Sequence, residues 1–377
     1  MLKVFHCADI HLDSPFSLYS PREAEKRRIE LRAAFTSALM FAREKKVDIF
    51  IISGDLFDSE YITRDTRELL VREFAKCGDM KIFIAPGNHD PYTVGSPYDT
   101  TDFGENVHIF GGERECVSLD GLNADIYGFG FTSKNYISSP VANWTIRDES
   151  RVNILVCHGD MVGGGDSTGP ITKQEIANSG FDYIALGHIH KPTGLQCENG
   201  VYYSYPGCIE GRGFDEQGYK GAMFGTVEKG KTDMQLLRFS KSRYESASVD
   251  ISGVSEKLEA LDIIRDAIRQ YTDDTALRLT LVGELKSAFV ILPNEIGKGC
   301  EFPYFIEIID KTHISPDLDK LEKSNTLKGI FVRKMLDGMR KQDEDSDEYR
   351  TLSLALKYGI AALEDRGIND YLSGGEH

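Results

Sequence analysis

Five short segments of the sequence carry side chains that can bind a metal ion. They are Asp9-Ile10-His11, Gly54-Asp55-Leu56-Phe57-Asp58, Gly87-Asn88-His89-Asp90, Cys157-His158-Gly159 and Gly187-His188-Ile189-His190. These segments hold five of the nine histidines in the chain. A mixture of carboxylate and imidazole ligands suits Mn²⁺, Fe²⁺ or Zn²⁺ better than Mg²⁺ or Ca²⁺, which prefer oxygen ligands. The residue types therefore predict a transition-metal centre.

Spacing within the segments supports the same interpretation. Asp9 and His11 are two residues apart, as are His188 and His190, and residues two apart at the end of a strand point to the same side. Either pair alone would be a weak signal, and a Gly-Asp or Gly-Asn after a strand is usually a turn. The coincidence of all five segments is what makes chance an inadequate explanation. The glycines at positions 54, 87, 159 and 187 let the backbone turn sharply and approach a ligand closely.

Apolar runs and helical periodicity indicate the elements that position these segments. Strands are expected at residues 2–8, 47–52, 80–85, 152–157 and 181–186, and helices at 21–44, 63–76 and 171–179. Such alternation predicts a layered α/β fold. Each metal-binding segment follows an expected strand, and ligands of open α/β sheets gather at the carboxyl ends of strands.

The remaining segments have other patterns. Residues 107–129 carry hairpin-like signals, and residues 201–204, 221–227 and 234–239 resemble a closing antiparallel series. A boundary is expected between residues 240 and 255. A helix at 258–271 with strands at 276–285 and 302–309 then predicts a small α+β region, before helices at 326–340 and 348–366. We therefore expect domains at 1–245, 250–315 and 316–377.

Composition excludes several classes of protein. The 377 residues are 41% hydrophobic and 28% charged, as in globular proteins, and no apolar run approaches the roughly 18 residues of a membrane span. The amino-terminal apolar stretch is too short for a signal peptide, and the seven cysteines show no CxxC pairing. We expect a soluble, cytoplasmic protein. The formal net charge of −16 is awkward for an enzyme of nucleic acids, although a local basic face, metal ions or a partner could supply the attraction.

The order of the five motifs resembles that of the calcineurin-like metallophosphoesterases over residues 1–239. Within that superfamily it is most similar to SbcD-type DNA-repair exonucleases, in particular their YhaO-like branch. The supporting segments are residues 6–12, 54–58 and 187–192, with Tyr205-Pro206-Gly207 followed by Glu210-Gly211-Arg212. The resemblance implies an α/β/β/α sandwich, a smaller C-terminal α+β capping domain and terminal helices.

The resemblance also implies roles for individual residues. The first ion would be held by Asp9, His11, Asp55 and His190. The second would be held by Asp55, Asn88, His158 and His188. Two such ions, with Mn²⁺ preferred and Fe²⁺ or Zn²⁺ as alternatives, share a water and lower its pKa. His89, which is not assigned to a metal ion, would be the catalytic residue that protonates the leaving alkoxide or orients the phosphate. Asp90 would either orient His89 or form a turn.

Two positions depart from the family pattern. Asp58 stands where some archaeal relatives have a histidine, and Cys208 where many relatives have serine or asparagine. The first departure puts a second histidine acting on the substrate in doubt.

The substrate is less firmly indicated than the metal centre. The resemblance favours a DNA exonuclease or endonuclease of the repair type. A basic run of Arg22, Lys26, Arg27, Arg28 and Arg32 is more typical of a solvated helix face than of a contact to DNA. Single basic residues that could surround the site are Lys134, Arg147, Lys173, Lys191, Arg212 and Lys220. Two alternatives stay open: a phosphomonoesterase or cyclic-nucleotide phosphodiesterase, and a non-catalytic scaffold. The resemblance further implies a homodimer and a separate SbcC-like or SMC-like coiled-coil ATPase, which the C-terminal helices would bind.

Overall fold

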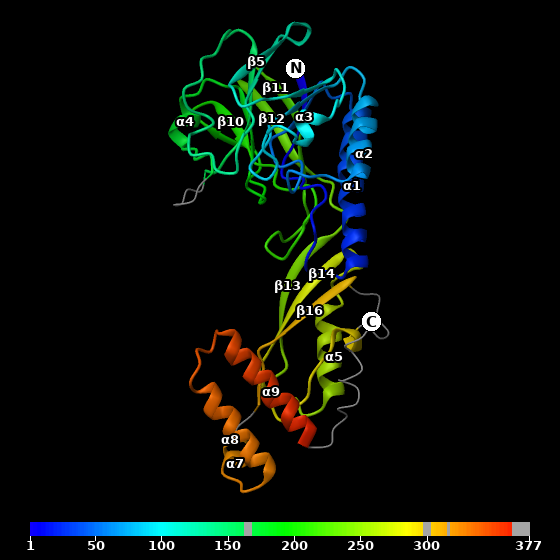
Figure 1. Cartoon of the computed structure of the whole chain (residues 1–377), viewed down its shortest axis with the longest axis vertical. Coiled ribbons are helices and arrows are strands. Elements are labelled where there is room, and N and C mark those ends of the chain that lie inside the picture. Colours follow the sequence, from blue (N-terminus) through cyan, green and yellow to red (C-terminus); the bar gives the residue numbers. More distant parts are fainter. Residues whose placement is uncertain (162–167, 297–302, 315–316, 364–377) are drawn as a thin grey trace. The chain divides into compact units, whose positions relative to one another are not determined.

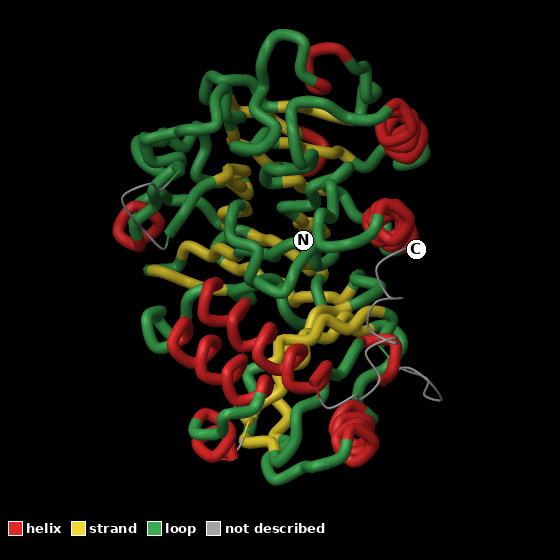
Figure 2. The backbone as a smooth tube through the Cα atoms, turned by 60° about the horizontal axis from the view of Figure 1, so that its bottom comes forward, coloured by secondary structure: helices red, strands yellow, loops and turns green. Residues whose placement is uncertain are grey.

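A computed structural model describes residues 1–161, 168–296, 303–314 and 317–363. The chain divides into two compact units, Met1–Tyr244 and Glu245–His377. Figure 1 labels several elements of each unit, and Figure 2 shows the helices, strands and loops along the backbone. The predicted three-domain division remains a prediction.

The first unit contains two six-stranded sheets. One has the order β12-β11-β1-β2-β3-β4, and the other has the order β5-β6-β7-β8-β10-β9. The strands of the first sheet are β1 (Leu2–Cys7), β2 (Ile49–Ile52), β3 (Lys81–Ile84), β4 (Val107–Ile109), β11 (Gly221–Glu228) and β12 (Lys231–Arg238). Those of the second are β5 (Glu115–Leu119), β6 (Ala124–Gly128), β7 (Val152–His158), β8 (Tyr183–Gly187), β9 (Gln196–Glu198) and β10 (Val201–Ser204).

The core lies between the two sheets. Alternate side chains of one sheet, such as Val4 and Ile51, pack with Ile126 and Val156 of the other, and all four are buried. Because strand side chains alternate between faces, Phe50 points instead to the outer face of its sheet. Both faces of β2 are covered, which explains why all four of its residues are apolar and buried.

Helices cover the outer faces of both sheets. On the first sheet, Phe35 of α1 (Pro21–Glu44) packs 6.3 Å from Phe50 and 6.3 Å from Phe74 of α2 (Arg64–Ala75), measured between ring centroids. On the second sheet, Ile176 of α4 (Lys173–Ala177) joins a cluster that includes Tyr127. The predicted α/β/β/α sandwich is confirmed. Two short elements, α3 (Pro97–Thr100) and the 3₁₀ turn η1 (Asp120–Leu122), complete the unit.

Two expectations about strand pairing need correction, and one strand was not predicted. The hairpin signal at residues 107–129 holds only for β5 and β6, which pair antiparallel, because β4 belongs to the other sheet, where it is parallel to β3. The expected antiparallel series is likewise correct for β11 and β12, whereas β10 is parallel to β8. The expected boundary segment contains a strand, β13 (Arg243–Asp250), which pattern reading missed.

The second unit combines a small sheet with helices. Its three-stranded sheet has the order β13-β14-β16, with β14 (Thr275–Val282) parallel to β16 (Phe305–Asp310), and its core includes Ile264 and Leu279. The other elements are β15 (Glu284–Leu285), β17 (His313–Ile314), α5 (Lys257–Ile268), α6 (Pro293–Ile296), α7 (Asp317–Glu322), α8 (Leu327–Met339) and α9 (Asp347–Leu363). Among the described residues, no helix is both long and apolar enough to cross a membrane.

Candidate metal centre

The loop after β1 is tied to the loop after β2 through the main chain. The N–H groups of Ile10 and His11 both donate to the carbonyl oxygen of Asp55, each at 2.9 Å. Asp9, His11 and Asp55 have left-handed φ angles of 50°, 51° and 50°. Strand alternation was the wrong explanation for the side chains at positions 9 and 11, because β1 ends at Cys7. The left-handed backbone directs them instead, at a cost of about 1–3 kcal/mol per residue.

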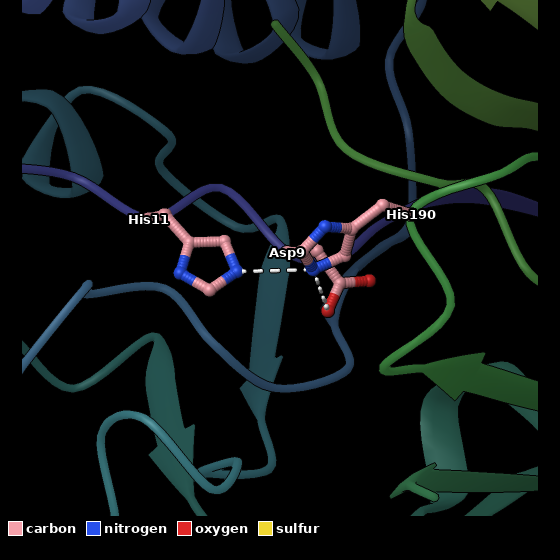
Figure 3. Close-up of side chains that lie close together, drawn as sticks. All are labelled: Asp9, His11 and His190. Atoms are coloured by element: carbon pink, nitrogen blue, oxygen red, sulfur yellow. Dashed lines mark hydrogen bonds and ion pairs between the residues drawn. The ribbon is translucent and has the colours of Figure 1, made fainter. Parts of the chain in front are cut away.

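Asp9, His11 and His190 form the first group of donor atoms (Figure 3). The Nε2 atoms of His11 and His190 lie 3.3 Å apart, and His190 Nε2 lies 3.8 Å from Asp9 Oδ1. Asp9 and His11 are fully buried. Three donor atoms from two different loops thus converge on one point.

Asn88, His158 and His188 form a second group. His158 Nε2 lies 2.9 Å from Asn88 Oδ1, and His188 Nδ1 lies 3.1 Å from the same oxygen. The two imidazole nitrogens are 3.3 Å apart. His188 and His190, although only two residues apart, therefore belong to different groups.

Asp55 lies between the two groups. Its Oδ2 atom is 3.7 Å from His11 Nε2 and 3.4 Å from His158 Nε2. Burial alone would raise the pKa of Asp55, but the charge and hydrogen bond of His158, with further charge from the other histidines, lower it well below its usual range. Burial would likewise lower the pKa of His158, but Asp55 raises it to about 9. The site therefore attracts positive charge at this position.

The hydrogen bonds around the histidines fit a divalent ion. His158 Nδ1 lies 3.0 Å from the carbonyl oxygen of Ser53, and because a carbonyl only accepts, the proton must be on Nδ1. In neutral His158, this leaves the Nε2 lone pair directed at Asn88 and Asp55, as in metal sites where the second ring nitrogen fixes the tautomer. The main-chain N–H of His188 donates to both oxygens of Asp9, at 3.0 and 3.1 Å, and so holds that carboxylate in place.

Glycine is required where these loops meet. A Cβ atom on Gly187 would lie 1.7 Å from the carbonyl oxygen of Ser53, and one on Gly87 would lie 2.2 Å from Asp55 Oδ1. Both distances are far inside van der Waals contact. The close approach expected of these glycines is thus present in the structure.

Comparison with known proteins identifies the family to which this arrangement belongs. Residues 2–192 match the sequence profile of a family described as calcineurin-like phosphoesterase. The chain belongs to this family.

Individual relatives of this calcineurin-like phosphoesterase agree with that placement. An uncharacterized metallophosphoesterase of Bacillus subtilis (strain 168), YhaO, is 30% identical over 297 residues, which cover 75% of this chain and 72% of the relative. The DNA double-strand break repair protein Mre11 of Methanopyrus kandleri is 26% identical, covering 67% of this chain and 60% of the relative. The protein of the same description from Thermoplasma acidophilum is also 26% identical, covering 68% and 72%. The chain is therefore a metallophosphoesterase, a class of hydrolase that uses divalent metal ions.

His89 differs from the other site histidines of this phosphoesterase because it is exposed. Its main-chain N–H donates to Asp55 Oδ1 at 2.9 Å, its Nδ1 lies 3.3 Å from the carbonyl oxygen of Asp58, and its ring centroid lies 4.8 Å from that of His11. It is thus anchored beside both donor groups, with Nε2 free of the contact to Asp58.

Asp90 has a structural role. It is 1% exposed, and it accepts hydrogen bonds from the main-chain N–H groups of Gly87 at 2.8 Å and Phe57 at 3.0 Å. Burial and the charge of Asp55 raise the pKa of Asp90 to about 7. Of the two predicted roles, the structure favours the turn.

Sequence reasoning missed Glu216, and the contacts of Arg212, beside the first group. Glu216 Oε1 lies 2.7 Å from His190 Nδ1, and Arg212 donates to both Glu216 and Asp58. Arg212 had been noted only as part of the family pattern and as a basic residue near the site. No motif spacing indicated Glu216, because a residue that contacts a ligand from behind leaves no local signature.

The predicted basic run on α1 is not a single solvated face. Arg27 is 1% exposed and donates to Glu210 at 3.0 Å and to the carbonyl oxygen of Gly211 at 2.8 Å. Arg27 is therefore neither on a solvated face, as expected of the run, nor available for the alternative contact to DNA. Lys220, another basic residue expected near the site, is also buried.

Proposed function

We propose that this metallophosphoesterase hydrolyses phosphodiester bonds in DNA, as an exonuclease or endonuclease of the repair type that uses two Mn²⁺ ions. The observation that carries the proposal is the meeting of two donor groups at a single oxygen, Asp55 Oδ2, which lies 3.7 Å from His11 Nε2 and 3.4 Å from His158 Nε2. The first ion would take Asp9, His11, Asp55 and His190. The second would take Asp55, Asn88, His158 and His188.

Ions bound at these residues would supply an activated water and neutralise charge on the phosphoryl oxygens. The protein's own contribution is the placement of His89. The contact between its Nδ1 and the Asp58 carbonyl oxygen, 3.3 Å, fixes the ring with Nε2 outward. Because that carbonyl only accepts, Nδ1 carries a proton, and Nε2 can protonate the leaving alkoxide only when the ring is doubly protonated. A positioned acid of this kind contributes about 10²–10⁴-fold.

DNA as the substrate is supported by relatives whose names state double-strand break repair. A separate coiled-coil ATPase, bound through the C-terminal helices, and a homodimer belong to the same proposal. The ATPase, unlike a second copy of this chain, could add the positive surface that a chain of net charge −16 lacks.

The same charge favours a second candidate. A phosphomonoesterase or cyclic-nucleotide phosphodiesterase acts on small substrates and needs no extended basic surface, so a net charge of −16 is no obstacle to it. The metal centre itself serves both reactions.

One set of assays separates these activities. The full chain, loaded with Mn²⁺, is incubated with end-labelled single- and double-stranded DNA and, in parallel, with a nitrophenyl monoester, a nitrophenyl diester and cyclic nucleotides. Shortening or cleavage of DNA supports the nuclease. Turnover of the monoester or a cyclic nucleotide without DNA degradation overturns it in favour of the second candidate. Two bound ions without turnover of any substrate would leave a scaffold, or an enzyme that requires its ATPase.

A further inference from the structure

A buried carboxylate lies directly behind His190. Glu216 is 3% exposed, and its Oε1 atom lies 2.7 Å from His190 Nδ1. Two groups of Arg212 hold Glu216: the main-chain N–H donates to Oε2 at 2.7 Å, and Nη2 donates to Oε1 at 2.9 Å. Glu216 therefore has a fixed position and orientation relative to the imidazole.

A second carboxylate faces His11 in the same way. Asp58 Oδ1 lies within ion-pair distance of His11 Nδ1, at 3.1 Å. His11 Nδ1 is buried and has no aligned hydrogen-bond partner among the described residues. Arg212 Nη1 donates to this same oxygen of Asp58 at 2.9 Å. One guanidinium group thus connects the carboxylates behind both histidines of the first donor group.

The second donor group has no such arrangement around His158, whose Nδ1 faces the main-chain carbonyl of Ser53. A carbonyl cannot be removed by substitution of a side chain, whereas Asp58, Arg212 and Glu216 can. The two groups therefore differ in a way that mutation can test.

The position of the proton on His190 decides whether it can bind an ion. If Nδ1 is protonated, it donates to Glu216 and leaves the Nε2 lone pair free. If Nδ1 is bare, it can accept from Arg212 Nη2, which lies 3.2 Å away, and a neutral ring then has its proton on Nε2. The shorter contact to the carboxylate, 2.7 Å, favours the first tautomer, because two acceptor atoms would repel each other at that distance.

We propose that Asp58, Arg212 and Glu216 are positioning residues that orient His11 and His190 and keep their Nε2 atoms free, so that they set the affinity for one of the two ions and not for the other. This inference rests on the two-ion centre proposed above. Arg212 couples the two sides because it binds both carboxylates and offsets their charge.

The test measures binding of Mn²⁺ to the full-length chain, by calorimetric titration and by the electron paramagnetic resonance spectrum of bound Mn²⁺. Outer partners of metal ligands typically change metal affinity by 10–100-fold. We therefore expect Glu216→Gln to weaken one ion by about 10–100-fold, to leave the other near its wild-type affinity, and to lose the spectrum of a coupled pair when Mn²⁺ is limiting.

Two further variants and a control sharpen the result. Asp58→Asn should lower the affinity for the same ion. Arg212→Lys keeps the positive charge but lacks the two guanidinium nitrogens that bind both carboxylates, so it should lower this affinity while preserving the fold. Glu73→Gln is the matched control, because the Glu73 side chain is 6% exposed and forms ion pairs with Arg43, Arg72 and Lys76 rather than with a histidine. Thermal unfolding in a chelator shows whether each variant is folded.

The outcomes distinguish this inference from the proposed function. Wild-type affinity for both ions in folded Glu216→Gln and Arg212→Lys overturns the inference alone, as does equal weakening of both ions. A wild-type chain that binds two ions without cleaving DNA overturns the nuclease alone. A wild-type chain that binds fewer than two ions overturns the metal centre and, with it, the inference.

Discussion

At the scale of single residues, His89 and Asp55 test different parts of the proposed chemistry. His89 is exposed and anchored through its main chain, so removal of its imidazole should leave the donor groups in place. We expect His89→Ala to retain two Mn²⁺ ions and to lose about 10²–10⁴-fold in turnover, the usual contribution of a general acid. The number of bound ions tests the first expectation, and single-turnover rates test the second.

Loss of an ion in His89→Ala would contradict this assignment and place His89 among the ligands. His11, Asp58 and His89 offer donor atoms close enough to hold an ion, which makes the measurement informative.

Asp55→Ala should weaken both ions together, because Asp55 Oδ2 faces a histidine of each group at 3.7 and 3.4 Å. The main-chain carbonyl of residue 55 would still accept the N–H groups of Ile10 and His11, so the loops should stay connected. Equilibrium dialysis against Mn²⁺ measures the effect. Retention of one tight ion would rule out a shared ligand.

At this scale, sequence patterns predicted which side chains lie together better than they predicted the backbone conformation that brings them together. All seven proposed ligands and His89 lie together at one edge of the sandwich, as expected of segments that follow strands. The pattern could not predict the left-handed conformations of Asp9, His11 and Asp55, because these depend on hydrogen bonds between loops far apart in the sequence. Glu216 was missed for the same reason.

At the scale of elements, Glu73 connects the two long helices. It lies on α2 and pairs with Arg43 of α1 at 3.6 Å and with Lys76 at 2.8 Å. Burial would raise its pKa, but hydrogen bonds from Lys76 and Arg72 and the charges of Lys76 and Arg43 lower the pKa of Glu73 below its usual 4.5. The ion pairs therefore stabilise the fold above pH 4.5, and this stabilisation is lost as pH falls through the lowered value.

We accordingly expect Glu73→Gln to lower the free energy of unfolding by about 1 kcal/mol at pH 7. The difference from wild type should vanish at a pH below the lowered pKa, where both side chains are neutral. Chelator-treated protein unfolded by urea at a series of pH values gives this difference. A constant difference across the series would show that the charge is irrelevant.

Local signals decided which elements could be predicted. Helix α1 was predicted with its observed bounds from its helical periodicity. The structure adds the local cause of its start, because Ser20 and Glu23 form a capping box and Pro21 occupies the first turn. Strand β13 was missed because its sequence, RYESASVD, is largely polar and only Tyr244 and Val249 are buried. The pairing of β4 and β10 depends on which sheet each joins, which no local pattern specifies.

At the scale of the whole molecule, the residues just before the end of the first unit support its metal centre. The Lys241 N–H donates to Glu210 Oε2 at 2.6 Å, and the Ser242 hydroxyl donates to Glu210 Oε1 at 2.7 Å. The Tyr244 hydroxyl donates to the carbonyl oxygen of Arg212 at 3.1 Å. These contacts hold the loop that carries Arg212 and Glu216.

We therefore expect a chain that ends at Asp250 to bind two Mn²⁺ ions. A chain that ends at Ser240 should bind at least one of them with an affinity lower by about 10-fold or more. Calorimetric titration of both chains, with circular dichroism to verify folding, makes the comparison. Equal affinities would show that residues 241–250 do not support the site.

The main-chain hydrogen bonds between the loops after β1 and β2 allow metal binding to be measured without changing any side chain. The N–H groups of Ile10 and His11 both donate to Asp55, next to residues held in costly left-handed conformations. An ion that binds only while these hydrogen bonds are intact lowers the population of chains in which they are broken. The size of that decrease rises with the affinity of the ion and with its concentration. Hydrogen–deuterium exchange at these two amides would then follow metal occupancy, even in a variant with no catalytic turnover.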